Sequence, residues 1–213
     1  FDSLFSQTKE QDLKDGLDQI DLGTAIGQIH DIFILSQNSK GIIIVDMHAA
    51  HERINYETLK SEWDKNKKIP SQQTMVPFVI NISQDEAENI QNNLKLFEAL
   101  GFEIIRSSER NITIYGYPAL LKETNFKEIF LPLTEDITAV ETVERIEEAI
   151  EKILATIACK SSLRAYDNIS LKEMNLLLRQ IESTKNSGYC SHGRPVWRFM
   201  SIAELDRIFM RGR

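Results

Sequence analysis

The sequence has few cysteines and no long apolar run, and each absence excludes a class of protein. Only two of its 213 residues are cysteine, which excludes a small secreted scaffold held together by several disulfides. No apolar run approaches the roughly 18 to 20 residues that a membrane-spanning helix needs. The first residues are polar and acidic, unlike the basic end and apolar centre of a signal peptide. We therefore expect a globular, cytoplasmic protein with no membrane partner.

Positive charge is also in short supply. The 25 Lys and Arg residues are outnumbered by 32 Asp and Glu residues, which leaves a formal net charge of -7. Non-specific affinity for nucleic acid comes mainly from Lys and Arg side chains that neutralise phosphates. The composition therefore argues against a protein that holds DNA by bulk electrostatics. If DNA is the substrate, a local basic patch, bound metal ions, a partner protein or another domain must help.

Apolar periodicity and turn signals predict an α+β fold. Residues 1–20 show no sustained apolar period and are expected to be the end of a linker. The apolar segment 27–35 is expected to be a single strand that forms a β-hairpin with the run 41–45. The further expected elements are helices over 49–66, 83–100, 140–159, 170–183 and 202–210 and strands over 75–82, 102–105, 112–117 and 196–200.

Three potential metal ligands cluster where the second strand meets the first helix. His48 and Glu52 are four residues apart, so their side chains share one helix face and could hold one ion. Asp46 approaches from the end of the strand, and the site is expected at the protein surface. The alternative is that Asp46 and His48 only cap the helix. A zincin protease is excluded because Asn55 stands where the motif His-Glu-x-x-His needs its second histidine.

A second group of potential ligands lies near the C-terminal end. Cys190 and His192 are two residues apart, and the Gly193-Arg194-Pro195 that follows keeps the chain in a non-helical turn. Together with Cys159 and Glu52 they would make a four-ligand zinc set. Spacing does not show whether such distant segments meet, so a plain buried role for both cysteines stays open.

Four segments together resemble the MutL family of DNA mismatch-repair proteins. Residues 46–57 resemble its endonuclease motif DQHA-x2-E-x4-E, with Met47 in place of Gln. Residues 158–160 resemble its motif of Ala-Cys followed by Arg or Lys, 190–195 its C-x-HGRP motif, and 209–211 its terminal F-x-R motif. The four motifs stand in the family's order. The chain is therefore similar to the C-terminal endonuclease and dimerisation region of a bacterial MutL protein of the endonuclease-motif type.

The resemblance implies a metal-dependent DNA-nicking endonuclease that acts as a homodimer. Its dimerisation and endonuclease subdomain would combine residues 21–74 and 155–213, with a mixed α/β sheet formed from both ends of the chain. Residues 75–154 would form an inserted α+β external regulatory subdomain. The implied partners are double-stranded DNA and a MutS-type mismatch-recognition protein. Two alternatives remain: a non-catalytic dimerisation module with a structural or regulatory zinc, and a metal-sensing regulatory domain.

The resemblance also implies roles for single residues. Zinc would be held by the residues Glu52, Cys159, Cys190 and His192, and a catalytic Mn²⁺ or Mg²⁺ would lie near His48. Asp46 would be the residue most closely tied to cleavage. Five further residues belong to the motifs without an assigned role: Glu57, Lys160, Arg194, Phe209 and Arg211.

The segment 72–77 matches Gln-x-x-Φ-x-Pro, the pattern with which bacterial proteins dock on the sliding clamp of DNA polymerase. Met75 and Pro77 would fit an apolar pocket as part of an extended peptide, and Gln72 completes the pattern. The alternative is the start of a strand, because six residues match such a pattern often by chance. Beside the MutL motifs, we expect clamp binding.

Overall fold

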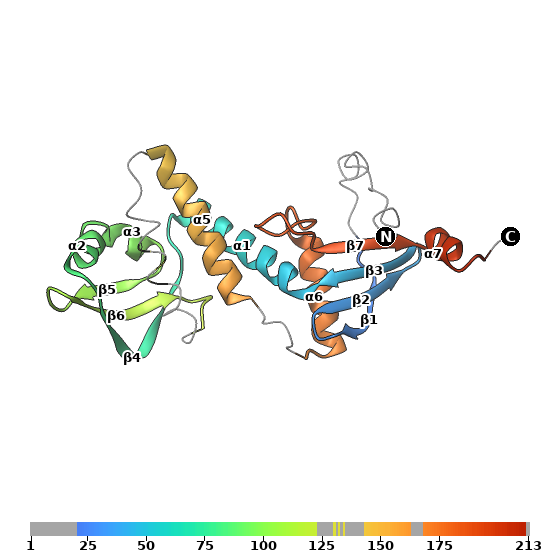
Figure 1. Cartoon of the computed structure of the whole chain (residues 1–213), viewed down its shortest axis with the longest axis horizontal. Coiled ribbons are helices and arrows are strands. Elements are labelled where there is room, and N and C mark those ends of the chain that lie inside the picture. Colours follow the sequence, from blue (N-terminus) through green and yellow to red (C-terminus); the bar gives the residue numbers. More distant parts are fainter. Residues whose placement is uncertain are drawn as a thin grey trace.

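The computed structural model describes residues 21–122, 143–162 and 168–211, together with residues 130, 132 and 134. Figure 1 shows an elongated molecule with a sheet toward each end and helix α1 (Met47–Asn66) running between them. The described ranges therefore confirm an α+β fold. Among their helices, none combines the length and the apolar content that crossing a bilayer requires.

The first sheet joins both ends of the described chain. Its strands are β1 (Thr24–Ile29), β2 (Phe33–Asn38), β3 (Gly41–Asp46) and β7 (Trp197–Ser201), in the order β1-β2-β3-β7. All three pairings are antiparallel. The strand that follows the Cys190 segment therefore lies beside the strand that ends in Asp46.

The prediction of one strand over 27–35 is wrong, because a tight turn divides that segment into β1 and β2. His30 and Asp31 have φ values of 51° and 54°, in the left-handed region, and with Ile32 they form the loop between the paired residues Ile29 and Phe33. The amide of Ile32 donates to the Ile29 carbonyl at 3.1 Å and closes the turn. The loop contains neither Gly nor Pro, so the sequence lacked the strongest turn signals.

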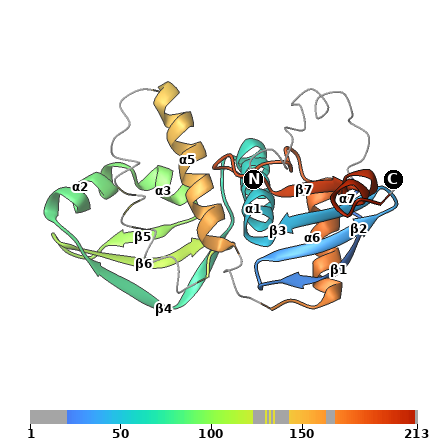
Figure 2. The ribbon, with the colours of Figure 1, turned by 45° about the vertical axis from the view of Figure 1, so that its right-hand side comes forward.

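Helices α1 and α6 (Leu171–Ser183) provide the core on one face of this sheet, which Figure 2 shows with α6 crossing the strands. The alternating residues Ile34, Ile43 and Val45 are buried there. The opposite face carries Leu35 and its cross-strand partner Ile44, which is 37% exposed. This face is therefore apolar but open to solvent.

Side chains of α6 also bind the backbone at the start of β1 and just before it. Asn175 accepts a hydrogen bond from the Ala25 amide at 3.1 Å, and Glu182 accepts one from the Leu22 amide at 2.7 Å. Arg179 donates to the carbonyl of Gly23. Backbone groups that a neighbouring strand would otherwise pair are thus bound by side chains of the same chain.

The second sheet has the strand order β4-β6-β5 and is antiparallel. The three strands are β4 (Ser71–Asn81), β5 (Glu103–Arg106) and β6 (Asn111–Pro118). Helices α2 (Gln84–Asn92) and α3 (Leu94–Ala99) precede β5. The predicted single helix over 83–100 is wrong, because Asn93 leaves the helical conformation at φ -109° and ψ 14°. Its side chain donates to the Asn89 carbonyl at 2.9 Å, a competing local bond that favours helix ends.

Helix α1 belongs to two cores, and this double membership positions the candidate site. Met47 and Ala50, near its start, pack with the first sheet, whereas Leu59 packs with the core of the second sheet. Helix α5 (Val143–Ser161) crosses α1 and is tied to it by an ion pair of 2.6 Å between Lys60 and Glu151. The end of α5 therefore arrives beside the first half of α1.

Candidate metal centre

The site begins at the junction of β3 and α1. Asp46 is the last residue of β3 and the N-cap of α1, where its side chain accepts a hydrogen bond from the Ala49 amide at 2.9 Å. The Asp46 amide in turn donates to the Val196 carbonyl at 2.9 Å. The capping role weighed for Asp46 is thus present, while its second carboxylate oxygen lies outside that cap.

Two groups of ligand-type side chains meet beyond this cap, and both contain Glu52. In the first group, ligand atoms of His48, Glu52 and Cys159 all lie within 4.8 Å of one another. In the second group, those of Glu52, Cys190 and His192 do so as well. Three segments far apart in the sequence, in α1, at the end of α5 and before β7, therefore converge on one carboxylate. Asp46 belongs to neither group among the described residues.

The loop before β7 holds two ligand-type side chains that differ in exposure, Cys190 and His192. The Cys190 amide donates to the Arg194 carbonyl at 2.8 Å, and the Gly193 amide donates to the Cys190 carbonyl at 3.0 Å. Gly193 has a φ of 76°, a left-handed conformation that suits glycine. The closed loop leaves Cys190 buried and the His192 side chain half exposed.

Glu52 is buried, with 2% of its surface exposed, so the expectation of a surface site is wrong for this residue. Its carboxylate accepts hydrogen bonds from the Ser191 hydroxyl and from Nδ1 of His192. A buried carboxylate is costly unless donors or cations compensate it. Helix periodicity correctly predicted the face of α1 on which Glu52 lies. Its burial depends on the Cys190 loop, and the position of that loop cannot be predicted from residue spacing alone.

The surroundings of Cys159 favour the neutral thiol when no cation is bound. Burial raises the pKa of Cys159 above its ordinary value of 9.0, and the nearby charge of Glu52 raises it further. Lys160 and Arg194 act in the opposite direction with smaller effects. A coordinated divalent cation reverses this balance, because it favours the thiolate strongly.

The remaining motif residues lie at varying distances from this centre. Glu57 forms a 2.8 Å ion pair with Arg53 in the middle of α1. Arg194 is an exposed member of the Cys190 loop. Phe209 and Arg211 follow helix α7 (Ile202–Ile208), at the opposite end of β7 from that loop (Figure 1). Their segment is exposed, with Phe209 at 70%, so within this chain they do not join the centre.

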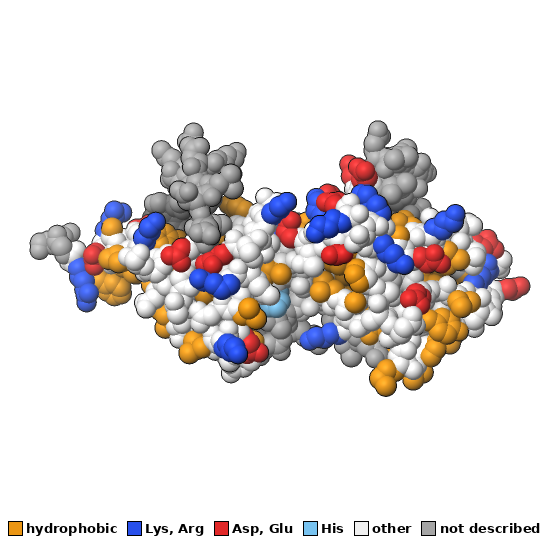
Figure 3. All heavy atoms as spheres, turned by 180° about the vertical axis from the view of Figure 1, so that it is seen from behind, with side chains coloured by type: hydrophobic (Ala, Val, Ile, Leu, Met, Phe, Trp, Pro, Cys, Tyr) orange, Lys and Arg blue, Asp and Glu red, His pale blue; other side chains and the backbone are white. Residues whose placement is uncertain are grey.

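The candidate clamp segment lies in β4, an edge strand of the second sheet. Its pairing with β6 is interrupted between Gln73 and Phe78. Met75 is 94% exposed there and Pro77 is also exposed, whereas Gln72 donates to the Leu121 carbonyl at 2.8 Å. Figure 3 shows apolar side chains gathered at the end of the molecule that this sheet occupies. The segment is thus partly a strand and partly an exposed apolar bulge.

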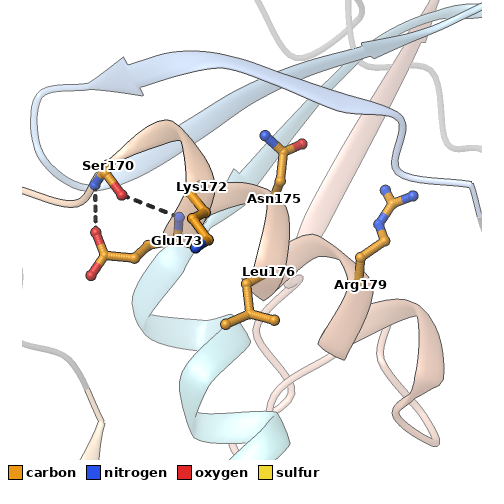
Figure 4. A pocket seen from close by; sticks show the side chains of 6 residues that line it. All are labelled: Ser170, Lys172, Glu173, Asn175, Leu176 and Arg179. Atoms are coloured by element: carbon orange, nitrogen blue, oxygen red, sulfur yellow. Dashed lines mark hydrogen bonds between the residues drawn. The ribbon is translucent and has the colours of Figure 1, made fainter.

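A surface hollow of about 610 Å³ on α6 lies apart from both ligand groups. Figure 4 shows its lining, which includes the capping pair Ser170 and Glu173 as well as Leu176. None of the predicted site residues lines it. The predicted ligands lie between α1, α5 and the Cys190 loop, so this hollow is not the candidate metal centre.

Comparisons with known proteins match this chain to MutL proteins. Residues 26–169 match the family model described as the MutL C-terminal dimerisation domain. Over 192 residues, the chain is 41% identical to a DNA mismatch repair protein MutL of Cellvibrio japonicus and 41% identical to one of Azotobacter vinelandii. A MutL protein of Coxiella burnetii is 42% identical over the same length.

Each of these alignments covers 90% of this chain but only 30% to 33% of the relative. The chain thus spans about a third of the length of the curated relatives that it matches. The family model, by contrast, covers well over half of the chain, from β1 to the segment before α6. The chain belongs to the family of MutL C-terminal dimerisation domains.

Proposed function

We propose that this chain is the metal-dependent, DNA-nicking endonuclease and homodimerisation region of a MutL mismatch-repair protein. The observation that carries the proposal is the convergence of two ligand groups on the buried Glu52 carboxylate. A carboxylate shared by two groups can bridge two ions. Two neighbouring divalent ions can stabilise both the attacking and the leaving oxygen of a phosphodiester.

The donor chemistry fits two different ions. Thiolates and imidazole favour Zn²⁺, so Cys159, Cys190, His192 and Glu52 would hold a regulatory or structural zinc. His48 and Glu52 offer imidazole and carboxylate, which suit a more weakly held Mn²⁺ or Mg²⁺. When bound, a divalent cation supplies a more acidic water and neutralises charge on the scissile phosphate.

The residues of the chain have separate tasks in this proposal. Glu52 orients both ligand groups, and the hydrogen bond from Ser191 fixes which of its oxygens faces the loop. Asp46 keeps one oxygen in the helix cap and has the other available toward water or the catalytic ion. His48 contributes its imidazole from the second residue of α1.

The open face of the first sheet supports the homodimer. Leu35 and Ile44 form a cross-strand apolar pair on it, and Ile42 lies two residues from Ile44 on the same side. Helix α7 has no buried residue within this chain, and Phe209 after it is 70% exposed. Apolar surface of this kind is typical of a subunit interface.

DNA, the clamp and a MutS-type protein are the proposed partners. Because the net charge is -7, the chain alone should bind double-stranded DNA weakly, and tethering to a clamp on DNA would raise the local concentration. The second sheet, with Met75 and Pro77 exposed at its edge, would be the external regulatory subdomain. β4 begins at Ser71, so this sheet crosses the expected boundary between 74 and 75.

The test is nicking of supercoiled plasmid with Mn²⁺ by the chain and by Glu52→Gln. Glutamine keeps the buried volume and removes the negative charge, so the variant should stay folded and dimeric but lose nicking. Nicking by the folded variant at the parent rate would refute the assignment of the activity to the Glu52 site. Zinc content and dimerisation without nicking in the parent would favour the rival function, a non-catalytic dimerisation module with a structural zinc.

A further inference from the structure

A side-chain-to-backbone hydrogen bond connects the two chain segments that carry the candidate ligands. Arg53 directly follows Glu52, and Tyr189 directly precedes Cys190. The Arg53 Nε donates to the Tyr189 carbonyl at 2.6 Å, across 136 positions of sequence. The hydrogen bond therefore joins the immediate neighbours of two ligand residues, one on α1 and one in the loop.

Arg53 is itself held in place from two further directions. Its Nη1 pairs with Glu57 at 2.8 Å, one turn along the helix, and the two side chains are only 12% and 17% exposed. Its guanidinium carbon also lies 5.5 Å from the centre of the Tyr56 ring. A planar guanidinium can donate in two fixed directions at once, which the point charge of lysine cannot do.

We propose that Arg53, oriented by Glu57, is a positioning residue that holds the Cys190 loop against α1 and so keeps Cys190 and His192 within reach of Glu52. This inference rests on the proposed metal site. It also gives the second glutamate of the 46–57 motif a role that does not require it to touch a metal ion. The ion pair with Glu57 orients Arg53, and the hydrogen bond from Arg53 to Tyr189 holds the loop in position.

The other bonds of the loop explain why such a contact is needed. Its backbone bonds, from Cys190 to Arg194 and from Gly193 to Cys190, fold the loop on itself and do not attach it to α1. The bonds from Ser191 and His192 to Glu52 do cross to α1, but they use the carboxylate that a metal ion would claim. Arg53 provides a crossing bond that metal binding leaves intact.

The experiment compares Arg53→Met, Arg53→Lys and Glu57→Gln in the full chain. Arg179→Met is the matched control, because Arg179 on α6 likewise donates to a backbone carbonyl, that of Gly23, and pairs with a glutamate, Glu182, but contacts neither ligand group. Zinc affinity is measured by competition with a chelator. Loss of an outer contact of this kind typically weakens metal binding about 10- to 100-fold, and we expect that loss for Arg53→Met and Arg53→Lys, and a smaller one for Glu57→Gln.

A second measurement needs no metal. In a Cys159→Ser background, the rate at which a thiol reagent labels the buried Cys190 in metal-free protein reports opening of the loop. Arg53→Met and Arg53→Lys should speed labelling by roughly tenfold or more, whereas Arg179→Met should not. Unchanged labelling in folded Arg53→Met protein would overturn the inference. If labelling is faster but the parent binds no zinc, the loop contact stands and the proposed metal site fails.

Discussion

The double position of Asp46, as helix cap and candidate active-site residue, allows its two roles to be separated by two substitutions. Asparagine accepts the same hydrogen bond from the Ala49 amide and is about as good an N-cap as aspartate. Alanine offers no acceptor. Asp46→Asn therefore removes the charge and keeps the cap, whereas Asp46→Ala removes both.

The expected stability differences follow from this geometry. The cap bond is 2.9 Å long, and replacing an N-cap by alanine typically costs about 1 kcal/mol. The lost charge at the helix N-terminus costs about 0.3 to 1 kcal/mol in either variant. Asp46→Ala should therefore be less stable than Asp46→Asn by about 1 kcal/mol, or roughly 2 to 4 °C in Tm for a chain of this length.

The assay combines thermal unfolding of chelator-treated protein with plasmid nicking in Mn²⁺. Both variants should lose nicking, although only Asp46→Ala loses the cap. Ser83→Ala is the control, because Ser83 is the N-cap of α2 and should lose a similar stability without losing activity. Nicking by pure, dimeric Asp46→Asn protein would falsify the active-site assignment, and equal Tm values for both variants would show that the cap contributes nothing.

Three further predictions concern zinc, the dimer and the clamp. Zinc should co-purify with the chain, and elemental analysis should find less zinc in Cys159→Ser or Cys190→Ser. Because the Cys159 pKa is raised and the metal binds the thiolate, zinc affinity should weaken as pH falls. Ile44→Arg should shift the chain from dimer to monomer in sedimentation, since it places a charge on the open apolar face, and an unchanged dimer would exclude that face. Met75→Ala with Pro77→Ala should suppress clamp-stimulated nicking and leave the Mn²⁺ background unchanged; equal loss of both activities would mean that the segment is only a structural strand.

Local signals in the sequence predicted much of the fold because capping and periodicity act over a few residues. The Ser170 capping box and the helix after it are confirmed, and so is the sheet formed from both ends of the chain. The turn at His30 and Asp31 was missed because it contains neither Gly nor Pro, the strongest turn signals. The break at Asn93 interrupts a periodicity that continues on both sides of it.

The sequence predicted which residues could be ligands at the candidate site, but not how the distant segments that carry them meet. Helix spacing put His48 and Glu52 on one face, and the structure brings Cys159 to both of them. The burial of Glu52 and the bond from Arg53 to Tyr189 depend on where a loop 136 positions away is folded. No local pattern encodes such a contact, since its partners are neighbours only after the two sheets and α5 have packed around α1.

The side chains of α6 that bind the backbone of β1 restrict how this protein can assemble. Asn175 binds the amide of Ala25 in β1, and Arg179 and Glu182 bind Gly23 and Leu22 just before it, whereas β7 is the other border of the sheet in the part of the chain that the structure describes. Protection at the start of β1 makes β7 the more accessible border for a second copy. Pairing of two copies through β7 would place both accessible borders inside the dimer, which favours a closed pair over a growing fibre.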